Sequence, residues 1–388
     1  MRALPLLFAL AATPAAAQTC GGPFPAFLDG LQAEAEARGI DPAAARAFLQ
    51  GARLDDRTLR ADNNQGVFRL EFVEFARRVI SADRMRRGAE NADRWDEIFD
   101  QVEARYGVPR GVLLAFWALE TDYGAVQGDF NTRDSLVTLA HDCRRPELFR
   151  PQVLAAMELH ARGQFDLDTT GAWAGEIGQV QMLPLDILER GVDGDGDGRV
   201  TLKTSVPDAL MSGARTLQDF GWRAGEPWLV EVDVPASLDW SLSGLDTKRP
   251  VADWVADGVA PRGPSFGMTD GMEASLILPQ GRGGPAFLAF PNYEVLFEWN
   301  QSFVYVTTAA YFATRLSGAP VFDAGDPAPQ LSGAEMEELQ RRLIAQGHDV
   351  GAVDGILGRQ TRRAVQAEQR RLGLPADAWP TRELLGAL

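Results

Sequence analysis

Histidine and cysteine are scarce in this chain of 388 residues, which has three histidines and two cysteines. The histidines, His141, His160 and His348, are far apart in the sequence, so we expect no zinc site of the usual His and Cys composition. Basic residues are also in short supply, because 38 Lys and Arg face 54 Asp and Glu, which gives a formal net charge of −16. A nucleic-acid-binding protein needs a basic face to neutralise phosphates, so the charge argues against nucleic acid as a partner.

Long apolar runs are missing as well. No segment has the roughly 18–20 consecutive apolar residues that a membrane-spanning helix needs. The short apolar run at residues 4–12 follows Arg2 and precedes alanines that end at Ala17, which is the pattern of a secretory signal peptide. We therefore predict a signal peptide at residues 1–17 and an exported, soluble, periplasmic protein. A lipid anchor on Cys20 is the less favoured alternative, because the residues just before it fit a lipidation site poorly.

Export gives the two cysteines a meaning. Cys20 and Cys143 would reach an oxidising compartment, where disulfides form and persist. We predict that they pair. The alternative is two buried free thiols.

The sequence pattern divides the chain into a large and a small part. Residues 26–115 have apolar side chains at helical spacing, and residues 226–290 contain short β-like runs separated by Pro and Gly. Helical spacing returns at residues 293–316. Residues 319–330, rich in Pro, Gly and Asp, are typical of a linker, and a small helical unit follows at residues 331–388. The prediction is an α+β fold, mostly α, with a minor β element and a small second domain.

One carboxylate lies at the end of an apolar helix. In the helix expected at residues 108–123, Val112 and Phe116 share a face, and Glu120 lies four positions after Phe116 at the edge of that face. Gly124 is the expected C-cap, so Glu120 is in the last turn. Burial and the negative end of the helix dipole both raise the pKa of a carboxyl there. Such a carboxyl can act as a general acid near neutral pH, and the alternative is an ordinary polar residue near solvent.

Three short blocks of sequence, taken in their order along the chain, resemble those of one protein family. They read ALETDYG at residues 118–124, WAGEIGQVQMLP at residues 173–184, and GPAF, PNY and WNQS within residues 284–302. Together they resemble the lytic murein transglycosylase B family, which has a lysozyme-like fold, over roughly residues 24–318. The resemblance predicts a lysozyme-like catalytic domain over residues 18–318.

The resemblance also implies a reaction. Enzymes of this family cleave the β-1,4 bond between N-acetylmuramic acid and N-acetylglucosamine in peptidoglycan without adding water. Glu120 would protonate the leaving oxygen, and the substrate's own acetamido group would stabilise the positive charge at C1. Glu120 would then take the proton of the C6 hydroxyl, which closes a 1,6-anhydro ring. This chemistry requires no cofactor.

The same resemblance suggests residues that bind the substrate. Gln181 and Asn300 match family residues that line the cleft. The aromatic residues Tyr123, Tyr305 and Trp173 are further candidates, with core packing as the alternative for each.

Glu176 departs from the family pattern, which more often has a small residue at that place. We favour a surface position or a structural hydrogen bond for Glu176 over a second carboxylate in the cleft, because glutamate is rarely buried. A second cleft carboxylate could activate water, so a hydrolytic muramidase on the same fold stays an alternative. A non-catalytic peptidoglycan-binding scaffold is the other alternative, although Glu120, Gln181 and Asn300 are all present.

An acidic loop follows the second block. Its carboxylates recur at alternate positions and a glycine stands at the sixth, which is the first half of an EF-hand calcium loop, but Thr204 replaces the glutamate of position 12. The family has such a loop with a later acidic ligand, which Asp208 matches. We expect a structural calcium site, with a flexible acidic turn as the alternative. The predicted ligands are Asp193, Asp195, Asp197, Arg199, Thr201 and Asp208.

The C-terminal unit has its own signature. A capping box at residues 332–335 opens a helical stripe, and the loop Asp-Gly-Ile-Leu-Gly at residues 354–358 precedes Thr361. This unit resembles the small three-helix peptidoglycan-binding domain over residues 331–388. We expect peptidoglycan glycan strands as the partner, with other cell-wall enzymes as further partners, and a monomeric protein.

Overall fold

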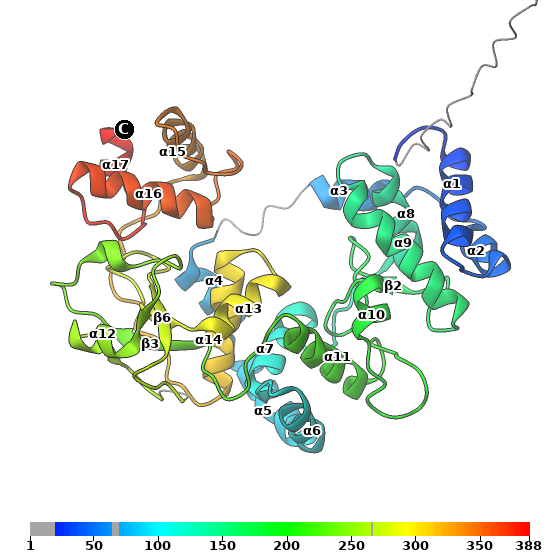
Figure 1. Cartoon of the computed structure of the whole chain (residues 1–388), viewed down its shortest axis with the longest axis horizontal. Helices are drawn as coiled ribbons and strands as arrows, with labels where there is room; N and C mark the ends of the chain where they lie inside the picture. The colour runs from blue at the N-terminus through cyan, green and yellow to red at the C-terminus, as the bar shows by residue number, and fades with distance from the viewer. Residues whose placement is uncertain (1–19, 64–69, 265–266) are drawn as a thin grey trace, which may run out of the picture.

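The computed structural model describes residues 20–63, 70–264 and 267–388, and helices dominate these ranges. The signal peptide expected at residues 1–17 lies outside them. Figure 1 shows two lobes joined by a central group of helices, with the C-terminal module packed on one lobe. The predicted class, α+β and mostly α, is confirmed.

The first lobe is a helical bundle formed by two separate stretches of chain. Helices α8 and α9 pack against each other in its centre, and buried Leu, Phe and Ala side chains from both stretches form its core. The two-residue strands β1 (Phe130–Asn131) and β2 (Thr170–Gly171) pair antiparallel beside the bundle. The helices of this lobe are α1 (Phe24–Ala37), α2 (Pro42–Leu49), α3 (Asp56–Asn63), α8 (Thr132–His141), α9 (Pro146–Ala161) and α10 (Pro184–Arg190).

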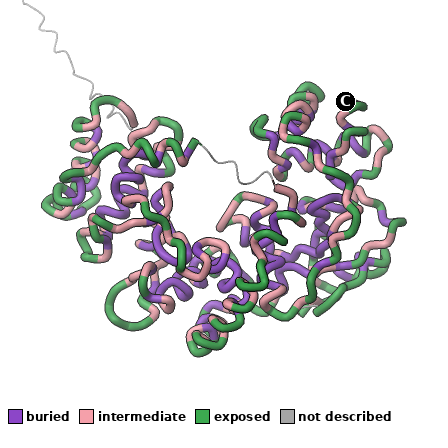
Figure 2. The backbone as a smooth tube through the Cα atoms, turned by 180° about the vertical axis from the view of Figure 1, so that it is seen from behind, coloured by how far each residue is buried: buried purple, intermediate pink, exposed green. Residues whose placement is uncertain are grey.

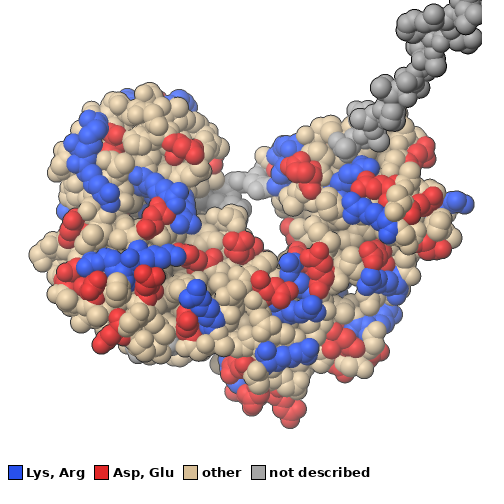
Figure 3. Space-filling model, viewed as in Figure 1, with Lys and Arg blue, Asp and Glu red and all other residues tan. Residues whose placement is uncertain are grey.

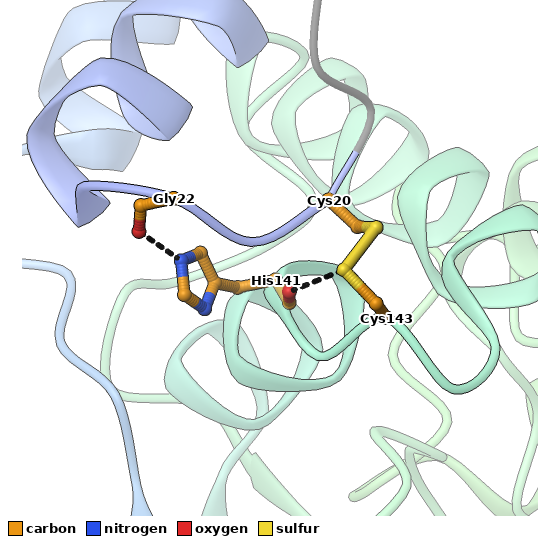
Figure 4. Close-up of a disulfide and its surroundings, with 4 residues drawn as sticks. All are labelled: Cys20, Gly22, His141 and Cys143. Carbon is orange, nitrogen blue, oxygen red and sulfur yellow. Dashed lines mark hydrogen bonds between the residues drawn. A yellow bond between two sulfur atoms is a disulfide. The ribbon is translucent and has the colours of Figure 1, made fainter.

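A disulfide closes the N-terminal end of this lobe. Cys20 and Cys143 are bonded, with their Cα atoms 5.3 Å apart, so the predicted pairing is confirmed. Figure 4 shows the bond beside His141, whose Nε2 donates to the carbonyl oxygen of Gly22 at 3.0 Å. Because the sulfur of Cys20 is part of this bond, Cys20 cannot also carry a thioether-linked lipid.

Removing the disulfide is expected to destabilise the protein. The bond joins residues 123 positions apart, and cross-links of long loops restrict the unfolded chain strongly. We expect the double variant Cys20→Ser with Cys143→Ser to lose about 2–4 kcal/mol of unfolding free energy. Urea unfolding with and without reductant measures this. Reductant should lower the midpoint of the native protein to that of the variant, and an unchanged midpoint would contradict the prediction.

The central helices surround α7 (Arg110–Thr121). All residues from 111 to 118 are buried, as expected for a helix that is apolar on every side. Gly111 lets α14 approach closely, since a Cβ atom there would lie 2.8 Å from the carbonyl oxygen of Ala313. The helices around α7 are α4 (Phe72–Val79), α5 (Ala82–Arg94), α6 (Asp96–Tyr106), α11 (Val206–Asp219), α13 (Pro291–Trp299) and α14 (Phe303–Leu316).

The second lobe contains an antiparallel sheet in the order β4-β6-β7-β3-β5. In the middle of the sheet, Leu288 of β7 pairs with Leu276 of β6 and with Val230 of β3, and all three are buried. Trp254 of α12 is fully buried on this core and donates to the carbonyl oxygen of Ala274. The remaining elements are β3 (Leu229–Asp233), η2 (Trp240–Leu242), β4 (Arg249–Pro250), α12 (Val251–Ala256), β5 (Ala260–Pro261), β6 (Glu273–Ile277) and β7 (Phe287–Ala289).

The C-terminal module has three helices, α15 (Gly333–Ala345), α16 (Arg359–Leu372) and α17 (Arg382–Ala387). The predicted capping box is present, because Ser332 and Glu335 bond reciprocally at the start of α15. Buried Leu, Met and Val side chains and Trp379 form a separate small core. The amide of Gln340 holds the loop before α16 by accepting from Asp354 N and Gly355 N.

The module lies directly on the second lobe, and Figure 2 shows buried residues in both. Arg362 of α16 donates to the carbonyl oxygen of Pro279 at 2.6 Å and lies over the ring of Phe303. Arg359 and Arg363 both pair with Asp246. On the face shown in Figure 3, basic and acidic side chains are interspersed, and the surface is hollowed between the two lobes.

Within the described ranges, no helix combines the length and the apolar character that crossing a membrane requires.

Candidate active site

Glu120 lies in the last turn of α7, as predicted, but the helix ends earlier than expected. Asp122 is the C-cap in a left-handed conformation with φ of 53°, in place of Gly124. Arg84 and Arg87 of α5 both pair with the carboxylate of Asp122. These pairs fix the end of α7 and direct Asp122 toward α5.

Two side chains from distant parts of the chain hold one oxygen of Glu120. Tyr305 of α14 donates its hydroxyl to Oε1 at 2.5 Å, and Trp299 at the end of α13 donates Nε1–H to the same atom at 3.0 Å. Trp299 also stacks on Phe116 of α7, with ring centroids 4.6 Å apart. Both hydrogen bonds described for the Glu120 carboxyl therefore hold the same oxygen, Oε1.

The surroundings of Glu120 favour its protonated form. Burial raises the pKa of Glu120, and the bonds from Tyr305 and Trp299 oppose this rise because they stabilise the ionised form. Burial, together with the nearby Glu120 charge, holds the pKa of Tyr305 well above its usual value. Tyr305 thus remains a phenol that donates. A carboxyl with a raised pKa and a fixed second oxygen is suited to proton transfer in both directions.

Glu176 is half-buried, so the surface position predicted for it is wrong. The structural hydrogen bond predicted as the other possibility stays a prediction, because backbone groups of Ala174 and Glu176 donate to its carboxyl. Its Oε2 is buried and has no hydrogen-bond partner among the described residues. Burial, with a smaller contribution from the charge of Glu120, raises the pKa of Glu176 to about 7. The backbone at Glu176 packs closely against β2, since a Cβ atom on Gly171 would lie 2.0 Å from the carbonyl oxygen of Glu176.

A cavity of about 240 Å³ adjoins Glu176. Trp299, which bonds to Glu120, forms part of its wall together with Glu176 and Gln181. The remaining wall residues are Met182, Leu183, Asp186, Thr216, Phe220 and Glu298.

Two of the predicted substrate-binding residues lie at this site. Tyr305 contacts Glu120 directly, and Gln181 lines the cavity. The Nε2 of Gln181 donates to the carbonyl oxygen of Gly178 at 2.7 Å, and Gln181 itself has a left-handed φ of 51°.

The other three predicted substrate-binding residues have contacts outside this cavity. Tyr123 donates to the carbonyl oxygen of Arg84 at 2.8 Å, and Asn300 accepts from the backbone N–H of Ser302 at 2.9 Å. Trp173 packs against the core of the first lobe. These contacts are structural, and binding roles for the three residues stay predictions.

Gln179, which the sequence interpretation did not name as a functional residue, connects the second block to α7. Gln179 accepts from Trp117 Nε1 at 3.0 Å through its side chain, and its backbone carbonyl accepts from the Thr121 hydroxyl at 2.6 Å. The contacts position the loop that carries Glu176 and Gln181 beside Glu120. The only signal in the sequence was the place of Gln179 inside the second block.

The acidic loop brings three of its predicted ligands together. One carboxylate oxygen each of Asp193, Asp195 and Asp197 lies within 4.8 Å of the others, and all three residues are exposed. Asp193 also accepts from the backbone N–H groups of residues 196, 197 and 198, which closes the turn. The oxygen-rich cluster fits a calcium ion.

The other predicted ligands lie outside this cluster. Asp208 is fully buried, and its two oxygens accept from the N–H groups of Gly194 and Thr201, so it orders the loop from within. The guanidinium of Arg199 donates to the carbonyl oxygen of Gly163. The side chain of Asp208 therefore supports the loop backbone, while that of Arg199 ties the loop to Gly163.

Comparison with known proteins gives a consistent set of relatives. The family model described as transglycosylase SLT domain matches residues 23–314, and the one described as putative peptidoglycan binding domain matches residues 332–388. Membrane-bound lytic murein transglycosylase B of Escherichia coli is 27% identical over 277 residues, which cover 68% of this chain and 75% of the relative.

Two solved structures are also similar. SltB3 from Pseudomonas aeruginosa, in complex with NAG-anhNAM-pentapeptide, has a TM-score of 0.85 and 36% identity, covering 95% of this chain and 99% of that one. The Escherichia coli lytic transglycosylase Slt35, in complex with calcium, has a TM-score of 0.65 and 25% identity, and the match covers 77% of this chain and 96% of that one.

Proposed function

The chain belongs to the transglycosylase SLT domain family, whose lysozyme-like fold it has, and on this premise we propose that it cleaves peptidoglycan as a lytic transglycosylase. The proposed bond is the β-1,4 link between N-acetylmuramic acid and N-acetylglucosamine, and the proposed product carries a 1,6-anhydro ring. The ligand of SltB3 contains anhNAM, which supports this product.

The observation that carries the proposal is the environment of Glu120. Because burial raises its pKa, the Glu120 carboxyl can hold a proton and give it to the leaving oxygen. The hydrogen bonds from Tyr305 and Trp299 to Oε1 then stabilise the carboxylate that remains. The same carboxylate then takes the proton of the C6 hydroxyl, whose oxygen attacks C1. One residue thus serves as acid and base, and the bond is cleaved without water.

Mass spectrometry of the products from purified murein sacculi tests the function. Anhydro-muropeptides are the expected products. Reducing muropeptides would indicate a hydrolytic muramidase, and no soluble product would indicate a non-catalytic scaffold; either result would overturn the proposal.

The domain plan proposed for the whole chain follows the sequence analysis. We place the signal peptide at residues 1–17, the catalytic domain at 18–318, the linker at 319–330 and the peptidoglycan-binding domain at 331–388. The last of these would hold the enzyme on its insoluble polymer and raise the local concentration of bonds to cut. We propose a soluble periplasmic monomer.

Calcium is expected to stabilise the protein without serving the chemistry. A calcium ion held by Asp193, Asp195 and Asp197 would offset two of their three clustered negative charges. Calcium at 100 times its dissociation constant would add about 2.7 kcal/mol of unfolding free energy. Differential scanning calorimetry should show a higher melting temperature with calcium and its reversal by chelator. The variant Asp195→Asn should respond less than the native protein, and a native protein that calcium leaves unchanged would contradict the prediction.

A further inference from the structure

Glu176 has an unused hydrogen-bonding atom beside the catalytic site. It lines the cavity whose wall includes Trp299, the donor to Glu120, yet its buried Oε2 meets no partner within the described residues. Buried polar atoms are nearly always paired, so such an atom on a residue of the cavity wall indicates that a ligand or a water completes it. The cavity of about 240 Å³ is far larger than the ~30 Å³ share of one water molecule in the liquid.

The wall of the cavity selects the chemistry of that ligand. Its charged members are the carboxyls of Glu176, Asp186 and Glu298, and no Lys or Arg is among the described wall residues. An anionic group, such as a peptide carboxylate, would be repelled. The wall also has apolar surface from Met182 and Phe220 and the indole of Trp299. The cavity therefore suits a neutral group with a hydrogen-bond donor, an acceptor and an apolar part.

An acetamido group on a sugar has these three parts. Its N–H can donate to a carboxylate of the wall, its methyl can contact the apolar side chains, and its carbonyl oxygen needs a donor. We propose that Glu176 contacts the substrate by donating a hydrogen bond from Oε2 to the acetamido carbonyl of an N-acetylated sugar in this cavity. The proposal rests on the proposed function and adds the residue that selects the N-acetyl group.

The charges that face Glu176 support a protonated donor. A negative charge on Glu176 is disfavoured by the charge of Glu120 of α7, and by Asp186 of α10 and Glu298 of α13, which lie in the same cavity wall. The positive charge of Arg145, before α9, weakly favours the ionised form. Burial is the largest influence and raises the pKa of Glu176 to about 7. Below that pH the carboxyl retains its proton and donates. Activation of water would require the ionised form.

Binding measured without turnover tests this role. In a Glu120→Gln background, the dissociation constant of an N-acetylglucosamine tetrasaccharide is measured by calorimetry at pH 6. Adding Glu176→Leu, which has similar volume and no donor, should weaken binding about 10-fold. Adding Glu176→Gln, whose amide can donate, should change it by less than about 3-fold. The exposed Glu189→Leu is the matched control, and it should bind as the background protein does.

Equal affinity in the Leu variant, or an equal loss in the Gln variant, would overturn the proposal. If the Leu variant does not fold, pH gives a second readout: affinity should fall from pH 6 to pH 8.5 when Glu176 is present and stay constant in the Gln variant. A flat profile in both also overturns it.

Failure of the proposed function would look different. Sacculi treated with the native enzyme would then release no anhydro products, whatever the tetrasaccharide affinities. If reducing products from the native enzyme disappear only in Glu176→Gln, Glu176 activates water and the donor role is wrong.

Discussion

Replacing Glu120 by glutamine is expected to lower the release of anhydro-muropeptides from sacculi by about 10³-fold or more, because one positioned acid–base group commonly contributes 10²–10⁴-fold and Glu120 performs two proton transfers. Glutamine has nearly the same shape, and its Oε1 can still accept from Tyr305 and Trp299. Only the transferable proton is lost. Binding to sacculi should therefore be unchanged, which a pull-down of the variant measures.

The effect of Glu120→Gln on the stability of the protein can also be predicted in direction. The folded pKa of Glu120 is raised by burial, so its favourable contribution is complete below the unfolded pKa and is lost as pH rises through the folded pKa. Glu120→Gln should therefore melt at a higher temperature than the native protein at pH 8, with a smaller difference at pH 4. The exposed Glu189→Gln serves as the control for both measurements. An active variant, or one that is less stable at pH 8, would contradict the assignment of Glu120.

The position of Glu120 could be predicted because helical spacing is local. Its partners could not be predicted in the same way, because Trp299 and Tyr305 lie 179 and 185 residues further along the chain. The resemblance suggested Tyr305 as a cleft residue. Trp299 stood inside a matching block, but nothing in that block indicated that its indole would donate to Glu120.

Glu176 shows why the usual exposure of a residue type does not predict its burial at a functional site. Glutamate is mostly exposed, so a surface position was the reasonable prediction. The loop around it turns at Gly175 and Gly178, with left-handed φ values of 92° and 82°, and this turn directs a charged residue inward. Such a turn depends on contacts with Leu136 and Leu202, which are distant in sequence.

Polar residues with local bonds were the other difficulty. Asn300 and Asp208 match residues of a cleft and of a metal loop, but Asn300 accepts from the backbone N–H of Ser302 and Asp208 accepts from the backbone of the loop itself. Sequence spacing cannot distinguish these two uses of the same side chain. The strands were easier, because the short β-like runs between Pro and Gly in 226–290 indicated β3, β6 and β7, while the two-residue strands β4 and β5 are too short to leave a pattern.

Removing both donors to Glu120 is the second large change. Tyr305→Phe with Trp299→Phe deletes two hydrogen bonds to an ionisable group, each worth about 1.5–3 kcal/mol, so we expect the turnover rate to fall by about 10²–10⁴-fold. Phenylalanine at 299 keeps the stacking on Phe116. The loss should fall on kcat more than on KM, because the donors act on the charge that forms when Glu120 gives up its proton.

The pH profile separates this role from simple packing. Both donors lower the pKa of Glu120, so without them the carboxyl keeps its proton to higher pH. In the double variant, the alkaline limb of the pH–rate profile should therefore shift to higher pH, and each single variant should show part of this shift. Since Tyr305 itself stays a phenol throughout this range, its ionisation does not contribute to the limb. A profile that keeps its midpoint while the rate falls would mean that the two rings only support the fold, and the stabilised carboxylate at the centre of the mechanism would have to be abandoned.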